Sequence, residues 1–283
     1  MCKIKISIFY FSGTGNTWWV TTKLVERLQK EGYKVEGNSI ESVIVIQKEK
    51  IEQILTASDI IGFGYPIYGS DIPENFHKFL KTLPKMEGKI AFVYTTMMLF
   101  SGDGAIVAKR LLKRKGFKVK QAINIRMPNN LKLPYPIFKR FPMHNGEENN
   151  LVKTKALVKI EKLVQKIISG KRWIQGADPF NIIGGLMQRV EMRIADLSVY
   201  ARNYFVDKEM CTECMQCVET CPTNNIVFED GNFIWQKSCI LCLRCYNHCP
   251  EDAIQYKRGT LDRKRYPRYK GPGDNFSVAK LQK

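Results

Sequence analysis

A run of four cysteines that occurs twice dominates the C-terminal part of this chain of 283 residues. Eight of the nine cysteines lie between positions 211 and 249, and residues 206–226 align with residues 234–254 at an offset of 28. Each copy keeps the spacing Cys-x2-Cys-x2-Cys-x3-Cys-Pro and ends at an isoleucine. The start of the chain predicts no secretory leader, and in such a chain clustered cysteines favour metal ligation over disulfides.

This spacing is the run of bacterial ferredoxins, and residues 206–257 resemble a bacterial-type domain with two 4Fe-4S clusters. In that pattern three cysteines in a tight turn surround one cube, and the fourth ligates the other cube. Zinc is the alternative, but zinc usually takes paired cysteines at hairpin ends, so two complete runs of four disfavour it. The resemblance implies one-electron transfer. It implies Cys211, Cys214, Cys217 and Cys249 as ligands of one cluster, and Cys239, Cys242, Cys245 and Cys221 as ligands of the other.

The N-terminal part alternates strand-like and helix-like patterns. Its apolar strand-like runs mostly lack a clean polar alternation, which suits strands buried on both faces of a sheet. Strands that alternate with amphipathic helices predict right-handed βαβ units, and therefore an α/β fold with a parallel sheet covered on both faces. The predicted strands are residues 3–10, 33–40, 59–65, 89–96 and 117–126, and the predicted helices are residues 17–29, 73–82, 104–115, 147–168 and 179–204.

The stretch FYFSGTGNT, residues 9–17, joins the first predicted strand to the first helix. A loop that ends at a helix N-terminus presents unpaired backbone N–H groups and the positive end of the helix dipole, so it can hold a phosphate without lysine. The stretch contains neither GxxxxGK(S/T) nor GxGxxG, which disfavours nucleoside triphosphates and dinucleotides and predicts a mononucleotide phosphate. Its glycines are Gly13 and Gly15, and its candidate side-chain donors are Ser12, Thr14, Asn16 and Thr17.

SGTGNT resembles the phosphate loop of flavodoxins, which bind FMN, and it stands where that family has it. The resemblance implies a flavodoxin-like, doubly wound sheet of five parallel strands, with the flavin ring at the ends of the third and fourth strands. Tyr68 could then stack on the isoalloxazine, although half-buried loop aromatics and an ordinary connection over 95–104 are the alternative interpretation. The implied ring contacts are Tyr65, Pro66, Ile67, Tyr68, Thr95, Thr96 and Gly102.

Together the two parts resemble the fused flavodoxin–ferredoxin proteins of anaerobes, the EFR-type ferredoxins, over residues 3–257, and MPNN at 127–130 also resembles that family. The resemblance implies an electron-transfer iron–sulfur flavoprotein with FMN and two 4Fe-4S clusters as cofactors. The predicted parts are a flavodoxin-like FMN-binding domain over 1–175, a helical linker over 176–205, a small α+β ferredoxin domain over 206–257 and a mobile basic tail over 258–283.

The formal net charge of +18 is concentrated in two segments. Residues 109–175 hold 18 Lys and Arg against 3 Asp and Glu, and residues 257–283 hold 9 against 2. Such segments can attract nucleic acid, an anionic membrane surface or an acidic protein, but a solvated lysine-rich face is the simpler explanation. The basic segment lacks interleaved aromatics that stack on bases, and no apolar run reaches the length of a membrane span. The sequence therefore predicts a cytoplasmic protein without a membrane span and disfavours nucleic acid as a partner.

Three functions are compatible with these motifs. The leading hypothesis is electron transfer between the clusters and FMN, with a redox protein as partner. The alternative is an FMN-dependent reductase of a small organic acceptor, with a pocket at loops 65–70 and 95–104 and electrons from its own ferredoxin part. A nucleic-acid or acidic-protein binder with sensor clusters is the third. No catalytic residue stands out, Cys2 is predicted to be a free thiol, and the sequence leaves open whether two chains meet as a homodimer.

Overall fold

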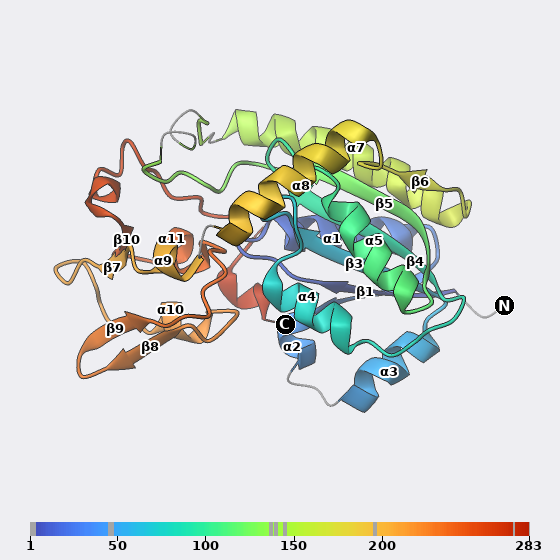
Figure 1. Ribbon diagram of the computed structural model, residues 1–283, viewed down its shortest axis with the longest axis horizontal. Coiled ribbons are helices and arrows are strands. Elements are labelled where there is room, and N and C mark those ends of the chain that lie inside the picture. Colours follow the sequence, from blue (N-terminus) through green and yellow to red (C-terminus); the bar gives the residue numbers. More distant parts are fainter. Residues whose placement is uncertain are drawn as a thin grey trace.

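The computed structural model shows two lobes (Figure 1). A central sheet flanked by helices forms the large lobe, and a smaller lobe of short strands and helices lies at one end of that sheet. None of the described helices is long and apolar enough to cross a membrane. Cys2 lies outside the described residues, which are 4–44, 48–135, 138, 141–143, 146–194, 197–273 and 275–282.

The sheet of the large lobe has six parallel strands in the order β2-β1-β3-β4-β5-β6. The order reverses beside β1, because the chain adds β2 on one side of β1 and β3 on the other. The first five strands have the flavodoxin-like order, which confirms the predicted fold class. The strands are β1 (Lys5–Tyr10), β2 (Lys34–Ser39), β3 (Ile60–Pro66), β4 (Ile90–Met97), β5 (Lys118–Arg126) and β6 (Trp173–Ile174).

Helices cover both faces of this sheet with apolar side chains. Ile6 and Ile8 point into the core that α1 and α7 close, whereas Phe9 points into the opposite core closed by α2 to α5. This alternation follows from the two-residue period of a strand. Each large apolar side chain that is fully buried contributes about 1.5–3 kcal/mol. The helices are α1 (Asn16–Lys30), α2 (Ile40–Ile44), α3 (Lys48–Ala57), α4 (Glu74–Thr82), α5 (Gly104–Arg114) and α7 (Glu147–Ile168).

The large lobe differs from the prediction in three places. Helices α2 and α3 lie between β2 and β3, where the sequence predicts none, because the β-branched run around Ile44 has no helical period. The two residues of β6 add a sixth strand beside β5. Of the helix predicted over 179–204, the structure describes α8 (Pro179–Ile194) and α9 (Leu197–Ala201), and the helical stretch ends before residue 204 because that residue already pairs in the small lobe.

Two antiparallel strand pairs frame the small lobe, and two short helices each contain one repeated cysteine. The pair β7/β10 joins the start and the end of the cysteine repeat, because Tyr204 lies opposite Tyr256. Tyr246 and Ile254 complete a small apolar core with these two tyrosines. The elements are β7 (Tyr204–Val206), α10 (Gln216–Glu219), β8 (Ile226–Glu229), β9 (Asn232–Trp235), α11 (Arg244–His248) and β10 (Ile254–Tyr256).

The C-terminal residues pack on both lobes, in contrast to the mobile tail that the sequence predicts. Tyr266 and Tyr269 are 3% exposed, and Leu281 is fully buried. Ser39 Oγ at the end of β2 donates a hydrogen bond to Leu281 O at 2.6 Å. Aromatic side chains bury much apolar area per residue, which explains how a basic segment can be held in place. This segment includes the short 3-10 helices η1 (Arg258–Leu261) and η2 (Val278–Leu281).

Candidate metal centres and phosphate loop

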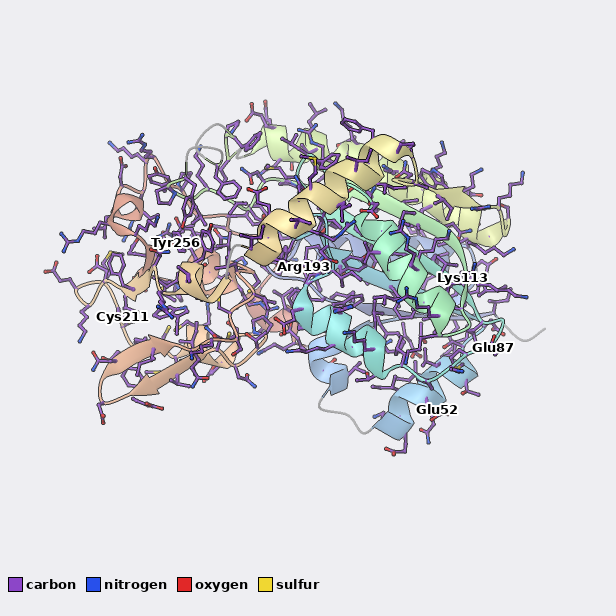
Figure 2. The ribbon with its side chains drawn as sticks, in the orientation of Figure 1. Glu52, Glu87, Lys113, Arg193, Cys211 and Tyr256 are labelled. Carbon is purple, nitrogen blue, oxygen red and sulfur yellow. The ribbon has the colours of Figure 1, made fainter. Side chains whose placement is uncertain are left out.

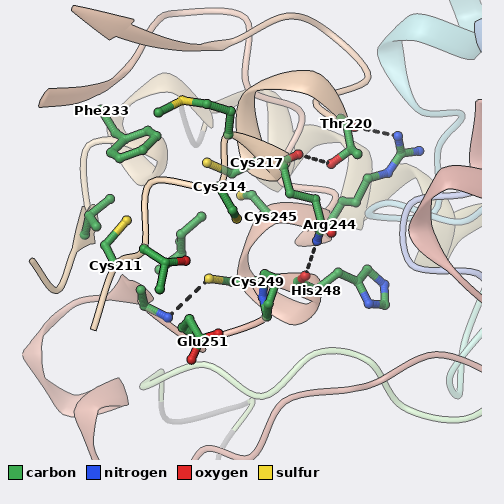
Figure 3. A pocket seen from close by; sticks show the side chains of 17 residues that line it. Cys211, Cys214, Cys217, Thr220, Phe233, Arg244, Cys245, His248, Cys249 and Glu251 are labelled. Carbon is green, nitrogen blue, oxygen red and sulfur yellow. Dashed lines mark hydrogen bonds between the residues drawn. The ribbon is translucent and has the colours of Figure 1, made fainter. Parts of the chain in front are cut away.

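Two cavities in the small lobe gather the repeated cysteines. We call them the outer cavity, of ≈ 430 Å³, and the inner cavity, of ≈ 330 Å³. The outer cavity lies toward the end of the molecule that is remote from the sheet, where Figure 2 shows Cys211. Cys245 borders both cavities. The outer cavity is further lined by Cys211, Cys214, Cys217 and Cys249 (Figure 3), and the inner cavity by Cys221, Cys239 and Cys242.

The fourth cysteine of each run lies in the cavity of the other run. Cys249 follows the second run of three but lines the outer cavity, and Cys221 follows the first run but lines the inner cavity. This is the exchange that the ferredoxin spacing implies. The lining residues are thus grouped like the two expected ligand sets, apart from Cys245, which lines both cavities, and the assignment of each ligand to a cluster stays a prediction.

The cysteines fit clusters better than single ions. Within the described ranges, no group of three or more His, Cys, Asp or Glu side chains converges on a point that could hold one metal ion. A tetrahedral zinc ion would need four ligand atoms within about 2.0–2.3 Å of one point. A cube that is ligated at its iron corners holds its cysteines farther apart, and four or more cysteines line each cavity.

The backbone around the cavities repeats together with the sequence. Glu213 and Leu241, 28 positions apart, both adopt left-handed conformations, with φ of 51° and 50°. Their N–H groups donate to Cys211 Sγ and Cys239 Sγ, each at 3.4 Å. Hydrogen bonds of this kind stabilise a thiolate ligand. The same offset relates two further pairs of left-handed residues, Met215 with Leu243 and Asn224 with Asp252. It also relates two amide-to-sulfur bonds, from Asn225 N to Cys221 Sγ (3.2 Å) and from Ala253 N to Cys249 Sγ (3.3 Å).

Several of these thiols are strongly buried. Burial is the largest cause that raises the pKa of Cys217 to about 12, that of Cys239 to about 11 and that of Cys242 to about 12. Neighbouring cysteine thiolates add to each shift. Only the thiolate ligates a metal, so these groups ionise when a cationic centre replaces their protons. The donor set therefore suits an iron–sulfur centre that enters with release of protons.

The loop between β1 and α1, residues 11–15, which we call the phosphate loop, is a buried turn. Several backbone N–H groups in it and in the first turn of α1 have no hydrogen-bond acceptor, and we call these the open amides. Gly15 (φ 103°) precedes the first helical residue, and α1 has no side-chain cap. The first helical hydrogen bond runs from Trp19 N to Gly15 O, so the preceding amides have no helical acceptor. Buried donors without acceptors fit an anion such as a phosphate group. Between positions 12 and 18, all of which the structure describes, the amides with no acceptor are those of Ser12, Gly13, Thr14, Asn16, Thr17 and Trp18.

The side chains of this loop are engaged with the protein itself. They fix the shape of the turn and tie it to β4 and to the MPNN segment, and their role as phosphate donors stays a prediction. The backbone then provides the open donors. The bonds are Gly15 N to Ser12 Oγ (3.2 Å), Asn130 Nδ2 to Thr14 Oγ1, Asn16 Nδ2 to Pro128 O (2.9 Å) and Thr17 Oγ1 with Thr96 Oγ1 (2.8 Å).

Some residues that the sequence places beside a flavin ring lie in the core. Tyr65 is fully buried, and its hydroxyl donates to Gly104 O at 2.8 Å. Thr95 is also fully buried and donates to Asn124 Oδ1 at 2.8 Å. Pro66 and Ile67 are half-buried at the end of β3. Ring contacts of these residues stay predictions.

Tyr68 and Gly102 lie at the loops after β3 and β4. Tyr68 Oη lies against Gly13 of the phosphate loop. A Cβ on Gly102 (φ 50°) would come within 2.6 Å of the Gly185 Cα, so α8 packs directly on that loop. Arg189 of α8 donates to Ser70 O (2.9 Å) and pairs with a buried carboxylate in the loop after β4. Helix α8 thus holds together the two loops at which the resemblance places the ring.

Arg244 joins the small lobe to the phosphate loop. Its side chain is 1% exposed, and it donates to Ser12 O (2.7 Å), Gly13 O (3.0 Å) and Thr220 O (2.6 Å). It also forms a bidentate pair with Glu41 at 2.6 and 2.7 Å. Burial would lower the pKa of Arg244, but the hydrogen bonds and charge of Glu41 outweigh burial and raise it. The arginine stays charged and satisfies carbonyls from both lobes.

Sequence reasoning missed this residue. Arg244 stands inside the second cysteine run, where a single charge predicts only a solvated side chain. The repeat offers the one available signal, because the aligned position in the first run is Gln216. Gln216 Nε2 stays within the small lobe and donates to His248 O.

The two tryptophans after the loop do not occupy it. Trp19 is 2% exposed and packs in the core beside α7, while the Trp18 ring lies 5.4 Å from the Phe276 ring. Tyr269 Oη donates to Asn16 Oδ1 at 2.6 Å. The C-terminal segment therefore covers the phosphate loop from a side that the sequence does not predict.

Comparison with known families agrees with the small lobe. Residues 210–254 match the model of the family described as the 4Fe-4S dicluster domain. Together with the strand order of the sheet, this match defines a flavodoxin-like domain followed by a 4Fe-4S dicluster domain, as predicted. The eight cysteines of the dicluster domain imply two 4Fe-4S clusters, which assigns the protein to electron transfer. No curated protein matches the chain.

Solved structures that resemble the chain cover about half of it. Flavodoxin from Megasphaera elsdenii is 26% identical, with 44% of this chain and 90% of that chain covered and a TM-score of 0.38. Flavodoxin from Pseudomonas aeruginosa is 13% identical over 57% and 97%, with a TM-score of 0.39. Rubredoxin oxygen:oxidoreductase from Desulfovibrio gigas is 19% identical over 58% of this chain but only 38% of its own, with a TM-score of 0.39. The strand order, rather than these superpositions, defines the fold.

Proposed function

We propose that this protein passes electrons between two 4Fe-4S clusters and a bound FMN. The observation that carries the proposal is the direct contact between the inner cavity and the phosphate loop. Cys242 O lies 3.0 Å from the position that a Cβ on Gly13 would take, and Arg244 bonds carbonyls of the same loop. A metal centre and an anion site that share one wall are suited to short-range electron exchange.

The residues of the phosphate loop and of the two cysteine-lined cavities fit this role. The loop amides that have no acceptor in the protein would bind a dianionic phosphate at the positive end of α1. FMN, when bound, supplies one- and two-electron chemistry. The cysteines of the two cavities would hold the clusters, and the chain links both sites at high effective concentration.

The packing of α8 favours a carrier over a reductase of small organic molecules. A reductase would need an accessible pocket at loops 65–70 and 95–104. Instead, Gly185 and Arg189 of α8 contact those loops at Gly102 and Ser70. We expect no saturable turnover of quinones or nitroaromatics with dithionite as donor. Saturating turnover would favour the reductase.

Anaerobic purification tests the cofactor content. We expect broad cluster absorption together with flavin bands, and FMN in the acid extract. Gly15→Ala should abolish flavin retention, because its Cβ would come within 2.7 Å of Pro272 Cδ and force φ away from 103°. Gly32→Ala is the matched control, since Gly32 also has a positive φ but nothing lies within 4 Å of its Cβ position. A wild-type protein that takes up no FMN after reconstitution would refute the proposal.

A further inference from the structure

The inner cavity is surrounded by buried donors that have no acceptor. Tyr204 Oη, Trp235 Nε1 and Asn225 Nδ2 belong to residues that line it, and each lacks a hydrogen-bond partner in the described part of the chain. Tyr68 Oη, beside Cys242, is a fourth such group. An unsatisfied buried donor is costly, so three around one cavity and a fourth beside one of its cysteines require a common explanation.

Packing holds these donors in place. The rings of Tyr204 and Trp235 stack with centroids 5.6 Å apart and an interplanar angle of 12°. The side-chain oxygen of Asn225 accepts from Ser238 Oγ at 3.2 Å, and its backbone N–H donates to Cys221 Sγ. This arrangement orients the amide and leaves its NH2 group as the unpaired end beside a cysteine of the inner cavity.

Tyr68 reaches the same place from the large lobe. Its ring packs in one apolar cluster with Cys242, and the space above Gly13 is bounded by both Tyr68 Oη and Cys242 Cβ. The donors therefore come from both lobes and approach the cavity from different sides.

The outer cavity lacks this set. Among the described residues that line it, His248 Nε2 is the one buried side-chain nitrogen or oxygen without a partner. Ala253 holds the repeat position that Asn225 holds at the inner cavity, and Phe233 supplies a ring without a polar atom. The two copies of the repeat thus differ mainly in the donors around their cavities.

We propose that Tyr68, Tyr204, Asn225 and Trp235 donate hydrogen bonds to the sulfur atoms of the inner cluster and raise its reduction potential. Reduction adds one electron to the cluster and increases its negative charge, and donors stabilise that charge more than they stabilise the oxidised form. Their effect is strengthened by burial, where electrostatic interactions are less screened. The inference rests on the proposed function only for the presence of clusters and does not require a flavin.

The test is a redox titration of the anaerobic holoprotein, with dithionite as reductant and electron paramagnetic resonance as readout. We expect Tyr204→Phe and Tyr68→Phe each to lower the potential of the same single cluster, with about a threefold change in its reduced-to-oxidised ratio at fixed poise, or about 28 mV at 59 mV per tenfold. Asn225→Ala, which copies the outer position, should act likewise. Tyr94→Phe is the control, because its buried hydroxyl is hydrogen-bonded to Thr21 Oγ1 at 2.6 Å in the core of the large lobe.

Cys214→Ser identifies the cluster that responds. This substitution alters a ligand at the outer cavity and should change the signal that the tyrosine variants leave unshifted. Unchanged potentials in both tyrosine variants, equal shifts of both clusters, or a shift of the Cys214-marked cluster would overturn the inference. Flavin content measured on the same samples separates the outcomes, since a flavin-free protein that shows the shift refutes only the proposed function.

Discussion

The inner and outer cavities are built from the same run of residues but face different surroundings. Their backbones repeat the same left-handed turns and the same amide-to-sulfur bonds. Yet Cys214 of the outer cavity is exposed, whereas the inner cavity adjoins the phosphate loop. Where the first run has Gln216, the second has Arg244, which reaches across to the other lobe. At this aligned position, the second copy of the repeat contacts the large lobe, whereas the first copy does not.

This difference suggests a division of labour between the two copies. In the outer copy Cys214 is exposed, and Cys211 lies at the end of the molecule that is remote from the sheet (Figure 2). The inner copy is enclosed by the loop and by donors such as Tyr68. Three measurements test whether the two copies differ in this way.

The largest effect is expected from Arg244→Met. The variant leaves Glu41 without its partner and removes donors from three carbonyls, so we expect a loss of about 3–5 kcal/mol in the free energy of unfolding. The matched variant Gln216→Met removes one hydrogen bond and should cost about 0.5–1.5 kcal/mol. Anaerobic urea unfolding, followed by cluster absorption and circular dichroism, measures both. Equal losses in the free energy of unfolding would show that Arg244 and Gln216 contribute equally to stability.

A smaller effect is expected when iron is removed. Exposure of Cys214 leaves the outer cluster open to chelators and oxygen, while the inner cluster requires local opening of the lobe contact. We expect iron loss in two phases of equal amplitude that differ roughly tenfold in rate, or about 1.4 kcal/mol in opening free energy. Iron assays over time, with paramagnetic resonance of the remaining cluster, report the order. A single phase would contradict the asymmetry.

The smallest effect concerns the repeated left-handed positions. Glu213 is exposed, so Glu213→Gly relieves backbone strain without loss of packing and should stabilise the protein by about 0.5–1 kcal/mol. Leu241 has the same φ but packs on the small core, so Leu241→Gly should give no net gain. Urea midpoints of the two holoproteins provide the comparison. A gain of equal size in both would mean that Leu241 contributes no burial.

Much of this architecture could be predicted because its chemistry is local in the sequence. The cysteine spacing itself specifies the two turns, and the exchange of Cys221 and Cys249 follows from the same pattern. The order of strands and helices predicts a doubly wound sheet, and the SGTGNT turn predicts open amides at a helix start.

What could not be predicted depends on long-range packing. Arg244 is one charge among many in the sequence, and only the fold reveals that its partners are Ser12, Gly13 and Glu41. In the sequence the C-terminal segment has the composition of a basic tail. Only the structure shows that it packs, with the Tyr269 hydroxyl bonded to Asn16. The protein partners of the loop hydroxyls could not be predicted for the same reason, because they lie on distant strands and segments.

Arg244 donates to two carbonyls of the phosphate loop, and these bonds couple assembly of the small lobe to anion binding at the loop. The turn that offers its amides to an anion is the same turn that the arginine holds from the metal-bearing lobe. Linkage is reciprocal, so if an anion in the turn tightens the contact between lobes by some factor, a fully assembled small lobe tightens the hold on that anion by the same factor. Iron-depleted protein should therefore release flavin mononucleotide more readily than iron-replete protein, whichever component is added first during reconstitution.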